Sequence, residues 1–377
     1  MTPEAGAAVG ATADTAADTR FEHGLVVGKF YPPHAGHLNL VRHALARCRT
    51  VTVQVLASSA ESLPGELRAA WLRELVPTAR VVHGLDDAEV DYASPAAWQA
   101  HLAIMRDLLD PADGPVDAVL TSDTYGRELA QRLGATWVRV DPSRQDLPVS
   151  ARAVRADPAR YWWALPAPVR AWYVRRVVVL GAESTGTTTL SHALATHYGT
   201  PWVPEYGRQW CEERPGGLEA PWVSPEFDLI ARAQAATEDE AARRTPRPLL
   251  VTDTDVLATA VWHERYTGSR SATVEALAGR RRPDLYVLTG DDIPFVQDGW
   301  RDGEHIRHDM HARFREVLRA TGVPWIEVRG DHDRRMAQAT AAIDELVARP
   351  RELSAPLPEA HVGLSTPGVL TDPEETP

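Results

Sequence analysis

Short apolar runs alternate with segments of helical periodicity along most of the chain, and this alternation predicts its fold. In the first half we expect five strands, over residues 25–27, 50–56, 80–83, 116–120 and 136–140. Helical segments separate them, as over residues 65–76, where Leu67, Trp71 and Leu75 share one face. Strand–helix alternation of this kind favours a parallel sheet with helices on both faces. We therefore predict a doubly wound, Rossmann-like α/β domain over residues 21–172.

The second half of the chain repeats this organisation. Apolar strands are expected over residues 175–180, 202–203, 249–252, 283–288 and 323–328. A helix over residues 334–348 closes the pattern, so we predict a second doubly wound parallel-sheet domain over residues 173–349. The two ends, residues 1–20 and 350–377, are rich in small, polar, Pro or Glu residues and are predicted to be disordered tails.

Composition narrows the class of protein. At 377 residues the chain is long enough for two domains with separate cores. Its net charge of -12 argues against general binding to nucleic acid or to anionic membranes. No run of about 18 apolar residues is present, so no membrane-spanning helix is expected. Cys48 and Cys211 are too few for a disulfide framework and fit a reducing cytoplasm. The oligomeric state stays open, and a homo-oligomer is compatible with the sequence.

The loop between the first strand and the first helix carries residues suited to binding phosphate. It reads G-K-F-Y-P-P-H-A-G-H over residues 28–37. Backbone N–H groups at a helix start are unpaired and attract anions, and Gly36 lets a substrate approach the backbone. His34 and His37 can donate hydrogen bonds to phosphate oxygens, although two histidines capping an ordinary helix are the alternative. No Cys or carboxylate accompanies them, which argues against metal ligation.

Lys29 in this loop is the only lysine among the 40 Lys and Arg residues. A lysine is a compact point charge on a flexible stem, and arginine does not replace it equivalently. The alternative interpretation is that Lys29 has survived by chance at an exposed position. A chain that otherwise uses arginine thus keeps its one lysine in a phosphate loop.

The pattern H-x-G-H after G-K-F-x-P resembles the nucleotidyltransferase superfamily, which moves an AMP or CMP group from a nucleotide onto a phosphate. The resemblance implies that His34 and His37 hold the triphosphate and stabilise charge on the transferring phosphoryl group. A second superfamily signature, I-S-x-x-x-x-R, is similar to the stretch from Val149 to Arg155. By that match Ser150 and Arg155 contact the ATP phosphates. We further expect Gly28, Phe30 and Gly36 to bind ATP and Lys29 to act in catalysis beside the two histidines. From the residues alone, the arginines of this stretch could equally form a solvated face.

A second phosphate-binding pattern, G-A-E-S-T-G-T-T-T-L, follows the strand over residues 175–180. It matches the strand–loop–helix layout G-x-x-x-x-G-K-[ST], whose backbone amides form a nest for phosphates. Thr188 stands at the Mg²⁺-binding hydroxyl position, but Thr187 occupies the lysine position and brings no charge. Phosphate binding should survive this change, and a glycine turn without nucleotide is the alternative. The expected ATP contacts are Gly181, Glu183, Ser184, Thr185, Gly186, Thr187, Thr188 and Thr189.

Acidic and arginine residues downstream fit a kinase. Asp253 resembles the carboxylate that ends a Walker B strand and could hold Mg²⁺. Glu205 or Asp255 could accept the proton of an attacking hydroxyl. Arg301 and Arg307 lie in a segment that suggests a mobile lid, where either could restore the charge absent at the P-loop. An exposed loop with paired charges is the alternative.

The sequence gives fewer signals for the site that binds the acceptor substrate. Trp98 is a candidate to stack on a flat ring, but a tryptophan among helical apolar residues is more often part of a core.

Taken in order, these motifs resemble the NadR-type family of bifunctional nicotinamide-nucleotide adenylyltransferase / ribosylnicotinamide kinases. The resemblance covers residues 22–348 and includes E-Y-G-R from Glu205 and D-T-D from Asp253. It implies that nicotinamide mononucleotide and ATP give NAD and pyrophosphate, and that nicotinamide riboside is phosphorylated to the mononucleotide. It also implies ATP and Mg²⁺ as cofactors, with Tyr206 and Arg208 at the substrate. Some members carry an N-terminal helix-turn-helix domain; here a short polar stretch precedes Phe21, so no DNA-binding role is expected.

Two other functions remain open at the level of sequence. The second domain could sense ATP or NAD without chemistry, since its P-loop lacks the lysine. Alternatively, the pair could be a coenzyme A synthase arrangement of pantetheine-phosphate adenylyltransferase and dephospho-coenzyme A kinase, which shares both loops. A flavin-nucleotide synthase is less expected, because the kinase half of that family lacks a P-loop.

Overall fold

The computed structural model describes residues 20–217, 219–297, 299, 301, 303–349, 351 and 353–356. Most of the two predicted tails therefore lies outside the described residues. The chain groups into two compact units: the first includes residues 20–31, 35–148 and 354–356, and the second includes residues 32–34 and 149–353. The predicted domain boundary between residues 172 and 173 stays a prediction.

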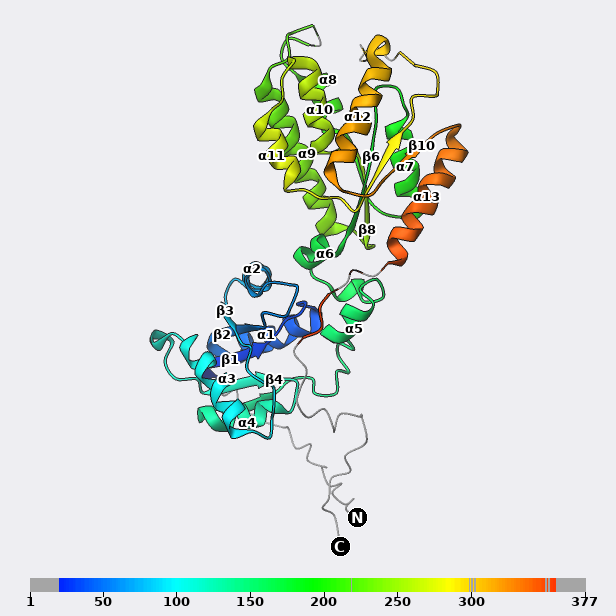
Figure 1. The fold of residues 1–377 in the computed structure, drawn as a ribbon. Helices are drawn as coiled ribbons and strands as arrows, with labels where there is room; N and C mark the ends of the chain where they lie inside the picture. Colours follow the sequence, from blue (N-terminus) through cyan, green and yellow to red (C-terminus); the bar gives the residue numbers. More distant parts are fainter. Residues whose placement is uncertain are drawn as a thin grey trace, which may run out of the picture. The chain divides into compact units, whose positions relative to one another are not determined.

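The first unit is built on a five-stranded parallel sheet with the strand order β3-β2-β1-β4-β5. The strands are β1 (Phe21–Gly28), β2 (Cys48–Ala57), β3 (Arg80–Leu85), β4 (Ala118–Thr121) and β5 (Thr136–Arg139). The connecting helices are α1 (Ala35–Arg47), α2 (Gly65–Leu75), α3 (Pro95–Asp107) and α4 (Tyr125–Leu133). Figure 1 shows α1 and α2 on one face of this sheet and α3 and α4 on the other. The predicted strands and the doubly wound fold are confirmed.

The central strand β1 supplies the cores on both faces of this sheet. Val26 packs with the residues of α1 and α2, whereas Leu25 and Val27 pack with those of α3 and α4. Side chains of a strand alternate between faces, so a continuous apolar run suits a strand that is buried on both sides. The next residues, which follow the carboxyl end of β1, form the predicted phosphate loop.

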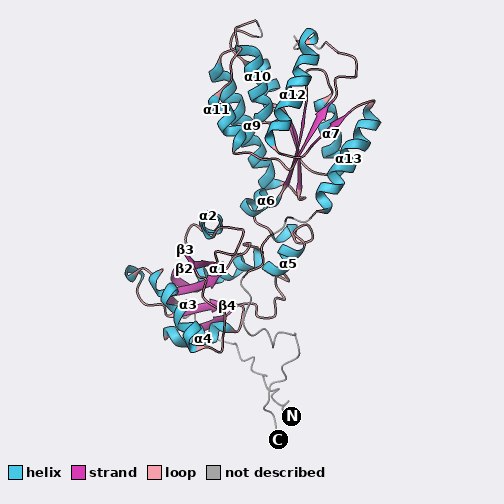
Figure 2. Ribbon diagram, viewed as in Figure 1, coloured by secondary structure: helices cyan, strands magenta, loops and turns pink. Residues whose placement is uncertain are grey.

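The second unit is also built on five parallel strands, in the order β10-β9-β6-β8-β7. The strands are β6 (Arg175–Leu180), β7 (Trp202–Val203), β8 (Leu249–Asp253), β9 (Leu285–Thr289) and β10 (Trp325–Val328). The helices are α5 (Ala151–Ala156), α6 (Ala167–Tyr173), α7 (Thr187–Tyr198), α8 (Tyr206–Glu213), α9 (Ser224–Arg244), α10 (Val256–Thr267), α11 (Ala272–Gly279), α12 (Arg307–Thr321) and α13 (His332–Ala348). Helices cover both faces of this sheet (Figure 2), so the second predicted fold is confirmed as well.

Six helices of the second unit, α6 and α8 to α12, are not assigned by the sequence pattern. The 21-residue helix α9 shows why, because its buried face includes Gln234 and Glu238 as well as Phe227 and Ile230. Polar residues on the buried stripe interrupt the apolar periodicity by which a helix is recognised.

The two sheets share one topological feature. In each, the first strand of the unit lies inside the sheet, with β1 between β2 and β4 and β6 between β8 and β9. Ligands of open α/β sheets bind beyond the carboxyl ends of the strands, where the strand order reverses. Both predicted phosphate loops leave the sheet at such a position.

Trp98 belongs to the core of the first unit. It is 5% exposed and packs with Leu102 and Met105. Its indole N–H donates to the carbonyl of Tyr92 at 3.0 Å, and the guanidinium of Arg132 lies 5.3 Å from the ring centroid. The ring face is therefore covered, which favours the core interpretation over stacking on an acceptor.

Among the described residues, we find no helix with the length and apolar character needed to cross a membrane.

A buried ion pair supports the segment that follows β2. The side chains of Arg68 on α2 and Glu61 are both fully buried, and Arg68 Nη2 lies 2.8 Å from Glu61 Oε2. Arg68 Nη1 also donates to the carbonyl of Lys29 at 2.6 Å. The pair thus ties α2 to the loop that follows β1.

Glu61→Gln should destabilise the first unit strongly, because it leaves the Arg68 charge buried without its carboxylate. Removing one partner of a buried ion pair typically costs about 3–5 kcal/mol. Hydrogen exchange of the β1 and β2 amides, read by mass spectrometry, gives the free energy of opening of this unit within the whole chain.

Glu22→Gln is the matched control, because Glu22 pairs with Arg49 on the surface, where both side chains are mostly exposed. Its effect on the same amides should be near zero. Equal effects of the two substitutions would contradict the role assigned to the buried pair.

Candidate functional site

The loop between β1 and α1 has an unusual backbone at Phe30. This residue has a φ of 47°, in the left-handed region that non-glycine residues seldom adopt, and its side chain is buried. Strained backbone of this kind persists where the surrounding packing fixes it, and it gathers at functional sites. The ring of His37 lies 4.9 Å from that of Phe30, so the buried phenylalanine sets the place of this imidazole.

The other predicted residues of this loop occupy distinct positions. Gly28 ends β1, and a Cβ at this position would approach the Phe30 ring to 3.3 Å. His34 is 4% exposed, and Gly36 and His37 belong to the first turn of α1. The imidazole of His37 thus stands at the N-terminal end of a helix, where the helix dipole favours an anion.

Lys29 is held by a carboxylate. Its Nζ lies 3.2 Å from Glu61 Oε1, and its side chain stays about a third exposed, at 36%. Because Glu61 also binds the buried Arg68, it fixes the ammonium group at the end of a three-residue network. Glu61 is a residue that the sequence analysis missed, although its place just after a strand end was a signal for it.

Ser150 and Arg155 belong to the second unit and lie at opposite ends of the short helix α5. Ser150 is its N-cap, and Ser150 Oγ accepts a hydrogen bond from the backbone N–H of Ala153 at 3.2 Å. Arg155 lies near the C-terminal end of α5 and is partly exposed. The predicted N-cap is present, and the phosphate contacts of both residues stay a prediction.

The loop between β6 and α7 has the geometry of a phosphate nest. Ser184 has a φ of 60° and Gly186 a φ of 83°, with Thr185 between them. Alternating backbone handedness turns successive N–H groups toward one concave side, which makes an anion site. Gly181 is required by space, since a Cβ there would lie 2.3 Å from Thr289 Oγ1 and 2.6 Å from Thr185 Oγ1.

The loop then feeds directly into α7. Thr187, Thr188 and Thr189 form the first turn of this helix, and Thr188 and Thr189 are exposed. First-turn N–H groups have no partner within the helix, so they add donors to the nest. No charged side chain stands at Thr187, as the sequence predicts.

Thr188 and Asp253 meet across the site. Thr188 Oγ1 donates to Asp253 Oδ2 at 2.6 Å, while Asp253 Oδ1 is buried without a hydrogen-bond partner in the described structure. Asp253 ends β8, next to β6, so parallel pairing places this carboxylate beside the P-loop. Burial raises the pKa of Asp253. An orphaned buried oxygen next to a threonine hydroxyl fits a hard cation.

Glu205 stands near Asp253. Glu205 is the N-cap of α8, and burial together with the charge of Asp253 raises its pKa. Like-charge crowding of this kind is typical of carboxylates that move protons.

Asp255 has a structural role instead. Asp255 Oδ1 accepts the N–H of Ala258 at 3.1 Å as the N-cap of α10, and Asp255 Oδ2 accepts the hydroxyl of Tyr286 at 2.9 Å. Since both oxygens are occupied inside the fold, the structure favours Glu205 over Asp255 as a base.

The segment after β9 contacts the P-loop. The N–H of Gly303 donates to Glu183 Oε2 at 2.7 Å, and the N–H of Val296 donates to Ser184 Oγ at 2.7 Å. Arg301 also reaches the Ser184 hydroxyl, at 3.3 Å. Arg307 differs from the predicted lid residue, because it is the buried first residue of α12 and donates to main-chain carbonyls.

Tyr206 and Arg208 lie on α8, just after Glu205. The backbone N–H of Tyr206 donates to Gln234 Oε1 at 2.9 Å, which anchors α8 on α9. Arg208 Nε lies 3.8 Å from Glu212 Oε1 on the same helix. Both side chains are partly exposed, and their contact with a substrate stays a prediction.

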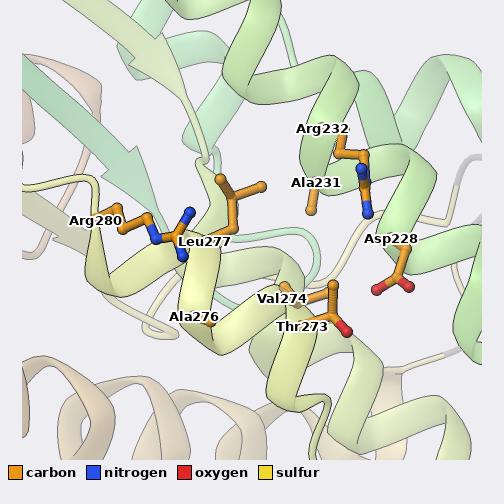
Figure 3. Close-up of a pocket in the computed structure, with 8 residues that line it drawn as sticks. All are labelled: Asp228, Ala231, Arg232, Thr273, Val274, Ala276, Leu277 and Arg280. Carbon is orange, nitrogen blue, oxygen red and sulfur yellow. The ribbon is translucent and has the colours of Figure 1, made fainter.

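The second unit also has two pockets that the P-loop does not line. One, of about 250 Å³, is formed by α9 and α11 (Figure 3) and is lined by Asp228, Ala231, Arg232, Thr273, Val274, Ala276, Leu277 and Arg280. None of these is a predicted site residue. The other, of about 510 Å³, is lined by residues 291–295, Glu304, Arg307 and His308 and borders the segment that contacts the P-loop.

Among the described residues, no group of three or more His, Cys, Asp or Glu is arranged to hold a metal ion. A cation at Thr188 and Asp253 would therefore need oxygens from a bound phosphate, as Mg²⁺ in nucleotide sites usually does.

Comparisons with known proteins agree with this arrangement. Residues 176–335 match the family described as AAA domain. The chain is 27% identical over 348 residues to the trifunctional NAD biosynthesis/regulator protein NadR of Escherichia coli (strain K12), covering 87% of this chain and 84% of that protein.

Solved structures agree at the level of the fold. A NadR protein in complex with NR has a TM-score of 0.69 at 21% identity, and one in complex with NAD and AMP-PNP has 0.65 at 20% identity. Each comparison covers 88% of this chain and 97% of the other. With two parallel sheets and two phosphate loops in the predicted order, the chain is similar to NadR proteins along most of its length.

Proposed function

We propose that the chain transfers an adenylyl group from ATP to nicotinamide mononucleotide, giving NAD and pyrophosphate, and that its second domain phosphorylates nicotinamide riboside. The observation that carries this proposal is the pairing of two separate phosphate loops within one chain that resembles NadR along 87% of its length. The NadR structures are complexes with NR and with NAD and AMP-PNP, which are the substrates, product and nucleotide analogue that the two reactions need. The coenzyme A and sensing alternatives are not favoured.

In the adenylyl transfer, the histidine loop acts on the triphosphate of ATP. His34 and His37 donate to phosphate oxygens, and Lys29, fixed by Glu61, adds positive charge. Negative charge develops on the departing pyrophosphate, so these groups contribute by stabilising that charge and by holding the two reactants in line. Gly28, Phe30 and Gly36 shape the loop, and Ser150 and Arg155 are further proposed phosphate contacts.

In the phosphoryl transfer, the nest of the second unit binds the phosphates of ATP. Thr188 and Asp253 would hold Mg²⁺, which would neutralise charge on the phosphates when bound. Glu205 accepts the proton of the attacking hydroxyl of the riboside, and Tyr206 and Arg208 on the following helix are proposed to orient that substrate. We further expect the enzyme to act in the cytoplasm.

His37→Ala should abolish NAD formation from nicotinamide mononucleotide while leaving riboside phosphorylation intact, because His37 and the P-loop belong to separate units. Loss of a preorganised donor to a phosphoryl group typically lowers the rate about 10²–10³-fold. Separate assays of NAD and of mononucleotide formation test this, and equal loss of both activities would contradict separate sites.

Thr188→Ala should impair the second domain instead of the first. It removes the hydroxyl that contacts Asp253, so the second domain should bind Mg²⁺–nucleotide more weakly. The affinity for AMP-PNP, measured with and without Mg²⁺, should lose its dependence on the cation. A variant whose affinity and Mg²⁺ dependence match the parent would remove Thr188 from the cation site.

Glu205→Gln should lower the turnover of riboside phosphorylation, because the amide cannot accept the hydroxyl proton; general base catalysis contributes about 10²–10⁴-fold. The KM for ATP should change little. Asp255→Asn is the matched comparison, since this residue caps α10, and its effect should fall on the melting temperature instead. A kinase that turns over normally with Gln at position 205 would rule out Glu205 as the base.

A further inference from the structure

Three consecutive residues of the P-loop are each held by a different arginine. Arg265 of α10 donates to Glu183 Oε1 at 2.8 Å, and Arg307 of α12 donates to the carbonyl of Ser184 at 3.0 Å. Arg335 of α13 donates to the carbonyl of Thr185 at 2.6 Å. Three helices that are far apart in the sequence therefore converge on a loop of three residues.

The contacts of Arg307 and Arg335 fix the direction of two peptide groups. In a planar trans peptide the C=O and the next N–H point to opposite sides. An arginine that binds the Ser184 carbonyl therefore turns the Thr185 N–H away from itself, and one that binds the Thr185 carbonyl does the same for Gly186. These N–H groups lie in the alternating stretch that forms the nest.

The two arginines are themselves buried and hydrogen-bonded to several groups. Arg335 is 4% exposed and also donates to the carbonyls of Gly330 and Gly290, at 2.8 and 3.0 Å, and to Asp292 Oδ1 at 2.8 Å. Arg307 is 7% exposed and donates to the carbonyl of Ile293 at 2.7 Å. Groups fixed in this way need no reorganisation when a ligand arrives.

We propose that Arg335 and Arg307 are positioning residues that hold the P-loop in its phosphate-binding shape and supply, through two peptide groups, the positive charge absent at Thr187. A cation bound to a carbonyl polarises the peptide and strengthens the N–H donor on its other side. The lysine of an ordinary P-loop contacts the phosphates directly. These arginines instead bind loop carbonyls, which point away from the N–H groups of the nest. This inference rests on the proposed binding of ATP by the second domain.

The strained backbone supports the same assignment. Ser184 adopts a positive φ without being a glycine, which is unfavourable unless the surroundings stabilise it. Its carbonyl is the one that Arg307 binds. Arg335 lies close to the next special position, since a Cβ on Gly186 would be 3.8 Å from Arg335 Nη1. The arginines thus contact the loop where its conformation needs support.

A mutant cycle between positions 335 and 187 tests the proposal in the full chain. The probe is Mg²⁺–AMP-PNP, and the readout is protection of the peptide over residues 181–190 from hydrogen exchange, which reports binding at this loop alone. Arg335→Met should weaken the affinity about tenfold or more. Thr187→Lys should restore most of this loss in the Arg335→Met background and gain clearly less in the parent, because the charges substitute for one another.

A merely structural role of Arg335 predicts a different outcome, since a lysine at position 187 cannot rebuild the contacts behind the loop. Equal gains from Thr187→Lys in both backgrounds, or parental affinity in Arg335→Met, would overturn the proposal. Arg281→Met is the matched control, because Arg281 is a half-buried arginine that binds Glu238 and Asp239 away from the P-loop. It should lower stability and leave the nucleotide affinity unchanged.

Further variants keep the test decisive. If Arg335→Met does not fold, Arg307→Met replaces it in the same cycle. Arg335→Lys keeps the charge with fewer donors, so it should lose less affinity and gain less from Thr187→Lys. A parent chain whose P-loop peptide gains no protection from AMP-PNP would overturn the proposed nucleotide binding of the second domain, and this inference with it. Protection in the parent combined with an additive cycle would overturn only the role of the arginines.

Discussion

Both halves of this molecule depend on the same interaction. In each, backbone N–H groups at the start of a helix have no partner within the helix and can bind an anion. In each unit a central parallel strand ends in a loop, and the loop opens a helix whose first turn has no internal acceptors. An anion satisfies these donors and interacts favourably with the helix dipole. The sheet therefore does more than bury apolar surface, because it delivers these donors to the edge where ligands bind.

The two halves stabilise their loops by different means. The histidine loop after β1 uses Lys29, the one lysine of the chain, and a buried Glu61–Arg68 pair behind it. The P-loop of the second unit uses no lysine and is held by arginines that bind its carbonyls and the Glu183 carboxylate. In both, side chains behind the loop fix its conformation: Glu61 and Arg68 in the first, and the arginines in the second.

The fold and the two loops could be predicted from sequence because each rests on local signals: apolar strands, glycines and helix starts along consecutive residues. Glu61 and Arg335 could not be singled out, since their importance lies in contacts with residues 32 and 150 positions away. Asp255 was ambiguous for the same reason, because only the contact with Tyr286 shows that its carboxylate is occupied. Helix α9 escaped prediction because Gln234 and Glu238 lie on its buried face.

The central claim, that one chain uses two phosphate loops for two successive reactions, is tested most directly with nicotinamide riboside and Mg²⁺–ATP as the sole substrates. The account predicts that NAD accumulates and that ADP and pyrophosphate are released in equal amounts, one of each per NAD. A chain that forms NAD from the mononucleotide but leaves the riboside unchanged, or that releases ADP without pyrophosphate, would contradict it.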